Sequence, residues 1–290
     1  MVDGKLRGLP NLVHPSFMGL FYNQTVIEAA GAKVPTLAST WDDVIEIARR
    51  VQASRPEVAG ISTGTGYSQV LVFTRNFGGE MIDPPILGKK PAIAGAPARA
   101  ALQLLVDLRH RHKVNPLPGA ANDFRKGTLA MFTDSALRAV WADDIKDAFK
   151  MDATLIPLGP GRKRGSQGHS DTWSITARST HRDAAWLLLK HFLSKEQGIE
   201  MFPKTRVPGA RFDAWAAMAG QPMFKPFKDF MENPGPEQLA IPANFRMLDL
   251  SNIVAKGLEP LWTGEQGVEQ AVAALLGPMQ RQLDLPRAGA

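Results

Sequence analysis

The sequence contains no cysteine among its 290 residues. This absence excludes disulfide bonds and metal sites built on thiolates, although it does not indicate a compartment. Long apolar runs are also missing, because the apolar stretch near the C-terminal end is interrupted by Gly277 and Pro278. We therefore expect no membrane-spanning helix. The first ten residues lack the charged and then apolar pattern of a leader, so we expect no export signal in the chain as given.

Motifs that mark common enzymes are missing as well. The metalloprotease pattern H-E-x-x-H, the hydrolase pattern G-x-S-x-G and the phosphate-binding P-loop do not occur. The loop at 64–69 starts like a dinucleotide-binding loop, but Gln69 stands where the third glycine is needed. His169, Ser170 and Asp171 supply the residue types of a catalytic triad, yet neighbours in an extended segment point to opposite faces. We expect a binding protein without a cofactor rather than an enzyme.

The formal net charge is +6, which suits an anionic partner such as nucleic acid, a lipid surface or a phosphorylated solute. The tight basic cluster GPGRKRG at 159–165 lies in a loop rich in glycine and proline, without aromatic residues between the charges. This pattern argues against nucleic-acid binding. His110 and His112 are expected on a helix, where residues two apart do not face each other, so we expect no metal site there.

Strand-like and helix-like segments alternate along the chain, which predicts an α/β fold. With 44% hydrophobic residues, the chain has ample material for a core in one or two domains. Strands are predicted within residues 18–23, 123–135 and 153–161. Helices are predicted at residues 24–31, 39–53, 67–79, 97–112, 181–193, 195–202 and 266–283.

Several predicted helices begin with a threonine that is followed three residues later by an acid or a glutamine, the pattern of a capping box. The pairs are Thr40 with Asp43, Thr180 with Asp183, and Thr263 with Gln266. Three tryptophans lie on apolar helix stripes or at caps, and we expect their side chains in the hydrophobic core. They are Trp41, Trp186 and Trp262.

Seven segments follow one another along the chain: DGKLRGLP, LFYNQTVIEAAG, TWDDVIEIARRV, FGGEMID, DFRKGTLAMF, DAAWLLLKHFLSKEQGIEMF and LWTGEQGVEQAVAALL. Together they resemble the family 1 extracellular solute-binding proteins of ABC importers, the receptors for sugars and related small solutes. The resemblance implies a periplasmic-binding-protein-like fold of type II, with two α/β lobes that close on a solute by hinge motion. It also implies a periplasmic or extracellular location and docking on the permease subunits of an ABC transporter.

Within that family the chain looks most similar to the branch that binds glycerol 3-phosphate and glycerophosphodiesters. Most sugar binders have a tryptophan a few residues after the segment AMF, where this chain has Leu137. The segment FRMLDLSNIVAKGLEPLWTG near the C-terminal end also resembles that branch, including its arginine. A plain sugar remains an open alternative as the solute.

The resemblance assigns six candidate ligand-binding residues, three of which carry hydroxyl groups. Ser16 lies on the crossing segment, where the branch places a ligand-binding serine. Tyr67 matches an aromatic residue that can stack on the solute, and Ser135 matches a serine that contacts it. Hydroxyl and aromatic side chains suit a sugar, which needs paired hydrogen bonds and offers an apolar face. Ser16 could equally be a turn hydroxyl, and Tyr67 a core aromatic.

The other three candidates depart from the family pattern or have a simpler alternative. Gly168 matches the first of two glycines whose backbone approaches the ligand, but the second is His169 here. Arg206 occupies a loop that lines the cleft, where the branch has a tyrosine. Arg246 matches the arginine expected to grip a phosphate, because a guanidinium fork suits that group. It could instead form a weak surface ion pair.

The resemblance also implies how the chain divides into lobes. Residues 1–18 and 172–205 are expected to form a remnant of the first lobe, residues 19–171 and 206–285 the second lobe, and residues 286–290 a loose tail. Members of the family normally carry a leader and most of the first lobe before DGKLRGLP, a gap on the order of 100 residues. We therefore expect a truncated gene model or a decayed fragment, with exposed strand edges, apolar patches and poor affinity.

Two other kinds of function remain open from the sequence. One is a hydrolase that acts on a glycoside or a phosphodiester on the same scaffold. The other is an interaction protein that uses the exposed remnant of the first lobe.

Overall fold

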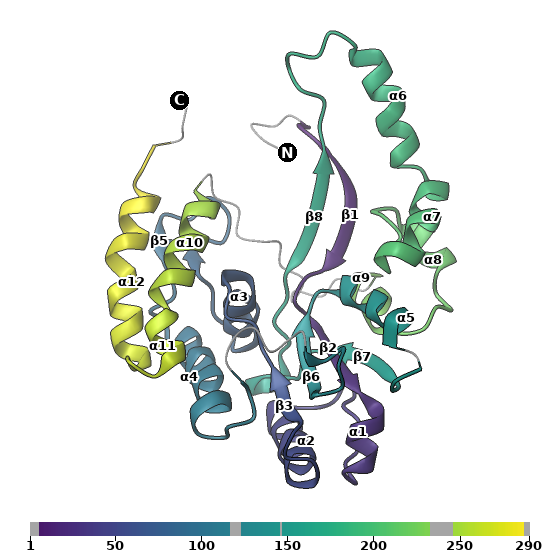
Figure 1. Cartoon of the computed structure of the whole chain (residues 1–290). Coiled ribbons are helices and arrows are strands. Elements are labelled where there is room, and N and C mark those ends of the chain that lie inside the picture. Colours follow the sequence, from purple (N-terminus) through teal and green to yellow (C-terminus); the bar gives the residue numbers. More distant parts are fainter. Residues whose placement is uncertain (1–5, 117–122, 146, 233–245, 287–290) are drawn as a thin grey trace.

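The computed structural model of the chain describes residues 6–116, 123–145, 147–232 and 246–286. The larger part of the molecule, which we call the body, is built on a sheet with the strand order β3, β6, β2, β7 (Figure 1). β3 is parallel to β6, whereas β2 is antiparallel to both of its neighbours. The strands are β2 (Gly19–Asn23), β3 (Ala59–Ser62), β6 (Leu129–Asp134) and β7 (Met151–Leu155).

Helices pack on both sides of this sheet because its strands are apolar on both faces. Along β2, Leu20 and Tyr22 join one buried cluster, whereas Phe21 between them joins the other. The first cluster contains residues of α1 (Gln24–Ala29), α2 (Trp41–Ser54), α3 (Tyr67–Asn76), α4 (Ala96–His110), α10 (Met247–Gly257), α11 (Glu259–Thr263) and α12 (Val268–Leu283). The short strands β4 (Ile82–Asp83) and β5 (Lys90–Pro91) pair beside these helices.

A two-stranded ribbon leaves the body and is the feature that positions the candidate site. β1 (Leu9–Pro15) pairs antiparallel with β8 (Gly168–Trp173), and residues 16–18 connect β1 directly to β2. In Figure 1 the ribbon rises from the centre of the molecule, away from the sheet. The β8 side of the ribbon is largely exposed, since residues 170–173 are all open to solvent.

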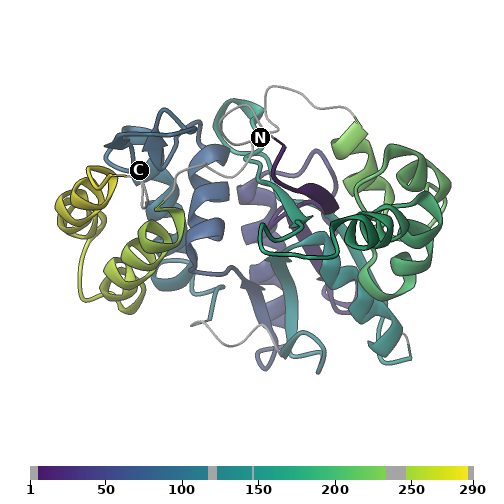
Figure 2. The same cartoon turned by 90° about the horizontal axis from the view of Figure 1, so that it is seen from above.

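Beyond β8 the chain forms helices on one side of the ribbon, whereas α10–α12 lie on the other (Figures 1 and 2). The second buried cluster joins several of these helices to the sheet through aromatic rings, including Phe21 and Phe132, whose centroids are 5.0 Å apart. The elements on this side are the 3₁₀ helix η2 (Ala136–Val140), α5 (Trp141–Ile145), α6 (Arg182–Phe192), α7 (Lys195–Thr205), α8 (Phe212–Ala217) and α9 (Lys225–Glu232).

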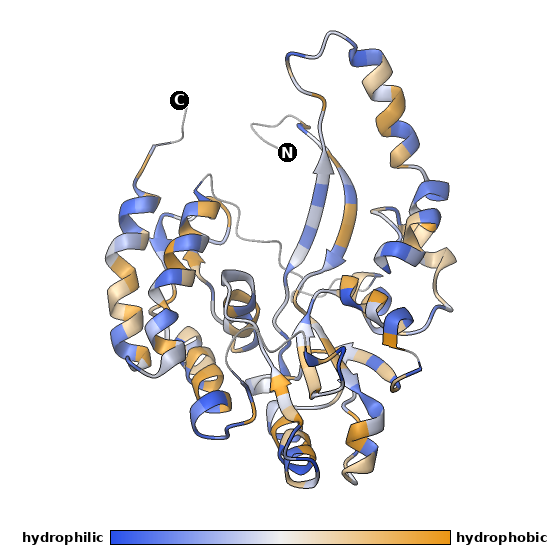
Figure 3. Cartoon of the chain, in the orientation of Figure 1, coloured by the Kyte–Doolittle hydropathy of each residue, from blue (hydrophilic) through white to orange (hydrophobic). Residues whose placement is uncertain are grey.

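Helix α6 has apolar side chains that are largely uncovered in the described part of the chain, with Leu189 as its one buried residue (Figure 3). Trp186 is 45% exposed, so the prediction that it lies in the core is wrong, whereas Trp41 and Trp262 are buried as predicted. The stripe is real, but α6 stands beside the ribbon rather than on the sheet. The exposed apolar side chains that we expected are present on α6, on β8 and just before β1: Leu6, Trp173, Trp186, Leu187, Leu188 and Phe192.

Only one of the three predicted capping boxes forms. Thr40 and Asp43 bond reciprocally at the start of α2. α6 begins at Arg182 after His181, without a side-chain cap, so the box predicted at Thr180 is wrong. The box predicted at Thr263 is also wrong, because that residue ends α11.

The final helix instead begins after Gly267. The left-handed Gly264 (φ 83°) turns the chain after α11, and α12 starts at Val268. The backbone N–H of Gly267 donates to Gln270 Oε1 over 3.3 Å. Of the tail predicted at 286–290, residues 287–290 lie outside the described residues.

The basic loop at 159–165 is anchored to the body through Arg164, whereas Arg162 and Lys163 are exposed. Arg164 donates from Nε to the carbonyl of Ile156 (2.9 Å) and from Nη2 to that of Leu37 (2.6 Å). A Cβ at Gly159 would collide with the backbone of Asn76 at the end of α3, so this close approach requires glycine. Within the described ranges, no helix combines the length and the apolar character that crossing a membrane requires.

Candidate ligand-binding site

Three of the six predicted ligand-binding residues meet where the ribbon joins the body. The backbone N–H of Ser16 donates to the carbonyl of Gln167 over 2.8 Å. Gly168 pairs with Pro15 at the first position of β8. Ser135 reaches the same place through His14, the residue before Pro15, with its Oγ 3.1 Å from Nδ1 of that histidine. The structure thus brings Ser16, Ser135 and Gly168 into one polar cluster, although they are far apart in the sequence.

Local sequence explains how Ser135 is held. It follows β6, and its side chain caps η2 by accepting from the N–H of Leu137 (3.4 Å). Its own N–H donates to Oδ1 of Asp134 (2.6 Å). The hydroxyl is fixed between a cap and an imidazole, and the residue is only 7% exposed.

Two histidines complete the cluster, and sequence reasoning assigned a role to neither. His14 and His169 are paired across the ribbon, with ring centroids 5.3 Å apart. His169 Nε2 lies 3.0 Å from Oδ1 of Asp171, which is possible because residues two apart on a strand share a face. The same rule could have identified His14 from the sequence, because His14 lies two residues before Ser16 and would share its face on an extended segment.

The ring of His14 is neutral at physiological pH. Burial, followed by the nearby His169, lowers the pKa of His14 from 6.5 to about 4. A neutral imidazole carries one donor and one acceptor, so Nδ1 of His14 can either donate to the hydroxyl of Ser135 or accept from it, depending on the tautomer. The cluster therefore offers hydrogen-bonding groups without a fixed positive charge on His14.

Tyr67 lies next to the cluster and is connected to it through its neighbour. It is the first residue of α3, and Gln167 Nε2 donates to Oγ of Ser68 over 3.3 Å. The Tyr67 hydroxyl is buried without a hydrogen-bond partner in the described part of the chain, and the residue is 6% exposed. Burial, strengthened by the charge of Glu80, raises the pKa of Tyr67. Stacking of its ring on a solute stays a prediction.

A buried ion pair ties α3 to the start of β8. Arg75 Nε donates to Oε1 of Glu80 over 2.6 Å, and Nη1 donates to the carbonyl of Ser166 over 2.8 Å. Both side chains are largely buried. Removal of one partner would leave an unpaired buried charge, and loss of Arg75 would also remove the bond that holds the carbonyl of Ser166 just before β8.

The two predicted arginines adjoin α7 and α10, helices that lie on opposite sides of the ribbon (Figure 1). Arg206 ends α7 in a left-handed conformation (φ 56°), forms an ion pair with Asp143, and stands over the ring of Phe202. Arg246 precedes α10, and its Nη2 donates to the carbonyl of Pro286 over 2.9 Å. These contacts do not assign either arginine to the polar cluster.

Residues 5–199 match the family of bacterial extracellular solute-binding proteins. The chain belongs to this family. Curated relatives from Brucella abortus and Brucella suis, each named as a binding protein, are 23% identical to it over 214 residues. These alignments cover 68% of this chain and 48% of the relatives, so the chain spans about half the length of the curated relatives it matches.

Solved structures of solute-binding proteins share the fold over nearly the whole chain. The GacH receptor of Streptomyces glaucescens, studied without ligand and with acarbose, is 20% identical with a TM-score of 0.83, covering 99% of this chain and 74% of that one. A maltose-bound protein of T. maritima is also 20% identical, with a TM-score of 0.81 and coverages of 97% and 74%. The chain therefore has the α/β fold of these binding proteins, as its sequence predicted.

The chemistry of the cluster suits this family of binding proteins better than it suits a hydrolase. Ser135 and His14 lie at hydrogen-bond distance like a nucleophile and its base, but a histidine whose pKa is about 4 is a weak base. The nearby carboxylate of Asp171 contacts His169 instead. Within the described ranges, no three side chains of the metal-binding types are placed to hold an ion.

Proposed function

We propose that this chain is the solute-binding component of an ABC importer and that its solute is a sugar or short oligosaccharide. The observation that carries the proposal is the polar cluster of Ser16, Ser135 and Gly168, built from three separate segments at the junction of the ribbon and the body. Hydroxyl, imidazole and backbone groups at close quarters match the alternating donors and acceptors of a polyol.

The ligands of the structural relatives, acarbose and maltose, also favour a carbohydrate. Glycerol 3-phosphate is the second candidate, and Arg246 is the residue proposed to grip its phosphate. We further propose that residues 1–18 and 172–205 belong to one lobe and residues 19–171 and 206–285 to the other. A periplasmic or extracellular location and docking on permease subunits follow from the same proposal.

Calorimetry on this chain with maltose, acarbose and glycerol 3-phosphate tests the proposal. We expect heat of binding from a carbohydrate, and at least roughly tenfold weaker binding by Ser135→Ala, since a hydrogen bond lost to a buried group is worth about 1–3 kcal/mol. Ser170→Ala is the matched control, because Ser170 is exposed on the same ribbon. No heat with any of the three solutes would overturn the proposal for this chain.

Arg246→Ala separates the two solute classes. If glycerol 3-phosphate is the solute, this variant should lose its binding and leave carbohydrate binding unchanged. Equal binding of glycerol 3-phosphate by the variant and the original chain would exclude the phosphate role of Arg246. Turnover of a chromogenic glycoside, measured on the same preparation, would favour the hydrolase instead.

A further inference from the structure

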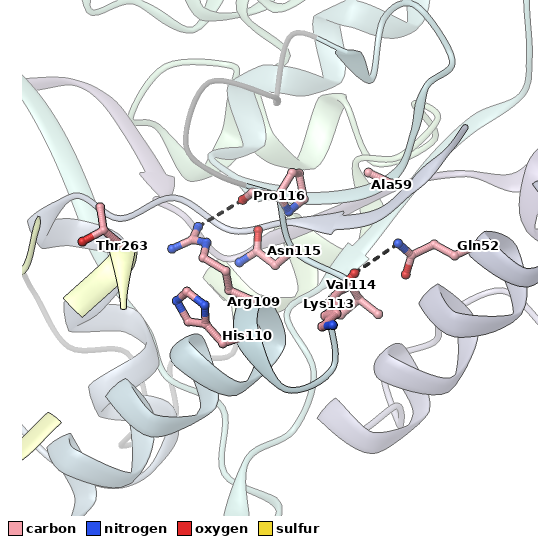
Figure 4. Close-up of a pocket in the computed structure, with 9 residues that line it drawn as sticks. All are labelled: Gln52, Ala59, Arg109, His110, Lys113, Val114, Asn115, Pro116 and Thr263. Carbon is pink, nitrogen blue, oxygen red and sulfur yellow. Dashed lines mark hydrogen bonds between the residues drawn. The ribbon is translucent and has the colours of Figure 1, made fainter. Parts of the chain in front are cut away.

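A pocket of about 460 Å³ lies at the C-terminal end of α4, in a part of the body that the candidate ligand-binding site does not use (Figure 4). It adjoins Ala59 at the beginning of β3, whereas Tyr67 follows the end of that strand. Its polar lining residues are Gln52, Arg109, His110, Lys113, Asn115 and Thr263. Among the residues that the structure describes, none that lines it is acidic.

The unusual member of this lining is a buried cation. Arg109 continues the apolar face of α4 that includes Leu102 and Leu105, and it is only 8% exposed. Its Nη2 donates to the carbonyl of Pro116 over 3.1 Å, and its guanidinium lies 6.0 Å from the ring centroid of Trp262. Burial lowers the pKa of Arg109, but an arginine stays protonated at neutral pH.

Arg109 has no carboxylate to balance its charge in the part of the chain that the structure describes. Its Nε–H is also buried without an acceptor, as is the indole N–H of the neighbouring Trp262. A buried charge is normally paired, because removing it from water without compensation is strongly unfavourable. The positive charge of the guanidinium, which lines the pocket, is therefore left for an anion to balance.

The backbone at this helix end does not oppose an anion as strongly as an open helix terminus would. The carbonyl of Asp107 already accepts from the N–H groups of Arg111 (3.1 Å) and His112 (2.7 Å). The carbonyl of Leu108 accepts from those of Val114 (2.9 Å) and Asn115 (3.1 Å). With these orphan carbonyls occupied, side-chain cations dominate the charge that faces the pocket.

An exposed histidine and an exposed lysine complete the polar lining. His110 is held in place by a 3.2 Å contact between Nε2 and the carbonyl of Trp262. Lys113 adopts a left-handed conformation (φ 58°), and its carbonyl accepts from Gln52 Nε2 over 3.2 Å. Figure 4 shows Arg109, His110 and Thr263 gathered on one side of the pocket, with Gln52 on the other.

We infer that this pocket binds a small molecule or ion through an oxyanion group, a phosphate or a carboxylate, received by Arg109. A guanidinium presents paired N–H groups that match such a group in a bidentate arrangement. The volume lies within the range of sites for small ligands. The inference is independent of the proposed function, because none of the lining residues belongs to the cluster at the ribbon.

Thermal unfolding of the chain in inorganic phosphate and in citrate, each against chloride at equal ionic strength, tests the inference. Binding to the folded state alone should raise the unfolding temperature with the logarithm of ligand concentration. Phosphate and citrate distinguish a phosphate from a carboxylate as the preferred group. No difference between either oxyanion and chloride would overturn the inference.

Variants separate a specific site from general salt effects, since phosphate also stabilises proteins non-specifically. Arg109→Met keeps the approximate volume of the side chain and should abolish the part of the rise in unfolding temperature that comes from specific binding. Arg109→Lys should weaken binding by roughly tenfold, because lysine lacks the paired N–H groups of the guanidinium. Arg111→Met is the matched control, because Arg111 follows the last residue of the same helix, is exposed and lies outside the pocket.

Lys113→Gln provides a second test that does not depend on the correct folding of the Arg109 variant. Lys113 is exposed, so its replacement should leave the fold intact and still weaken phosphate binding several-fold. An unchanged phosphate response in both Arg109→Met and Lys113→Gln would mean that Arg109 only packs against Trp262. An equal loss in Arg111→Met would mean that surface charge, not the pocket, attracts the anion.

Discussion

Trp41 and Trp186 both lie on an amphipathic helix, yet Trp41 is 5% exposed and Trp186 is 45% exposed. Helix α2 lies against the sheet, and Trp41 Nε1 donates to Oδ1 of Asn76 over 2.7 Å. Helix α6 stands beside the ribbon, where the rings of Trp173 and Phe192 contact each other but leave the stripe open. An apolar stripe therefore shows that a helix needs a partner, but not whether the same chain supplies it.

The largest expected effect comes from comparing a buried leucine with a leucine on the exposed face of α6. Leu102→Ala in α4 removes a fully buried side chain, so we expect the free energy of unfolding to fall by about 2–5 kcal/mol. Leu187→Ala in α6 removes a side chain that is 61% exposed, so we expect a change within about 0.5 kcal/mol. Urea unfolding measures both. A similar loss in the two variants would show that the α6 stripe is covered in solution.

The junction between the two regions should respond to acid through His14. The unfolded chain binds a proton at this histidine near pH 6.5, but the buried ring does so only at about pH 4. Protons therefore favour the unfolded state across this window, and stability falls as the pH drops from about 6.5 to 4, by up to about 3 kcal/mol.

Urea unfolding at several pH values measures this effect. The variant His14→Asn keeps a polar group near Ser135 but cannot titrate, so its stability should depend less on pH across the same window. His110→Asn is the matched control, because that ring is exposed. A pH dependence that is identical in His14→Asn and the original chain would rule out His14 as its source.

The smallest expected effect compares two threonines with the same sequence pattern. Thr40→Ala removes the cap of α2 and should lower the free energy of unfolding by about 1 kcal/mol. Thr180→Ala should change the free energy of unfolding by no more than a few tenths of the effect of Thr40→Ala, because His181 rather than Thr180 precedes α6. Equal effects of the two substitutions would show that Thr180 caps the helix after all.

The sequence predicted the α/β class and most helices because their apolar periodicity reports the face that each element buries. It could not distinguish Thr40 from Thr180, since a capping box also requires an extended backbone at the threonine. The box predicted at Thr263 failed for another reason: Gly264 permits a left-handed turn that ends one helix before the next begins.

The candidate site was predicted through resemblance, and that method names only positions that a family shares. It named Ser16, Ser135 and Gly168, which the fold brings together. It did not name His14, whose contact with Ser135 depends on how the ribbon sits over η2. Nor could periodicity identify Arg109 as a buried cation, because a charged residue at the end of a helix usually faces solvent.

The loop between β8 and α6 is exposed throughout most of its length and contains Arg178. A protease that cuts there would produce one piece with the sheet and the ribbon and another with α6–α12. The second piece buries Val254 and Leu275 in the same cluster that holds Leu71 and Leu102 of the first. The two pieces should therefore stay together under native conditions, and separately expressed halves should reassemble by fragment complementation.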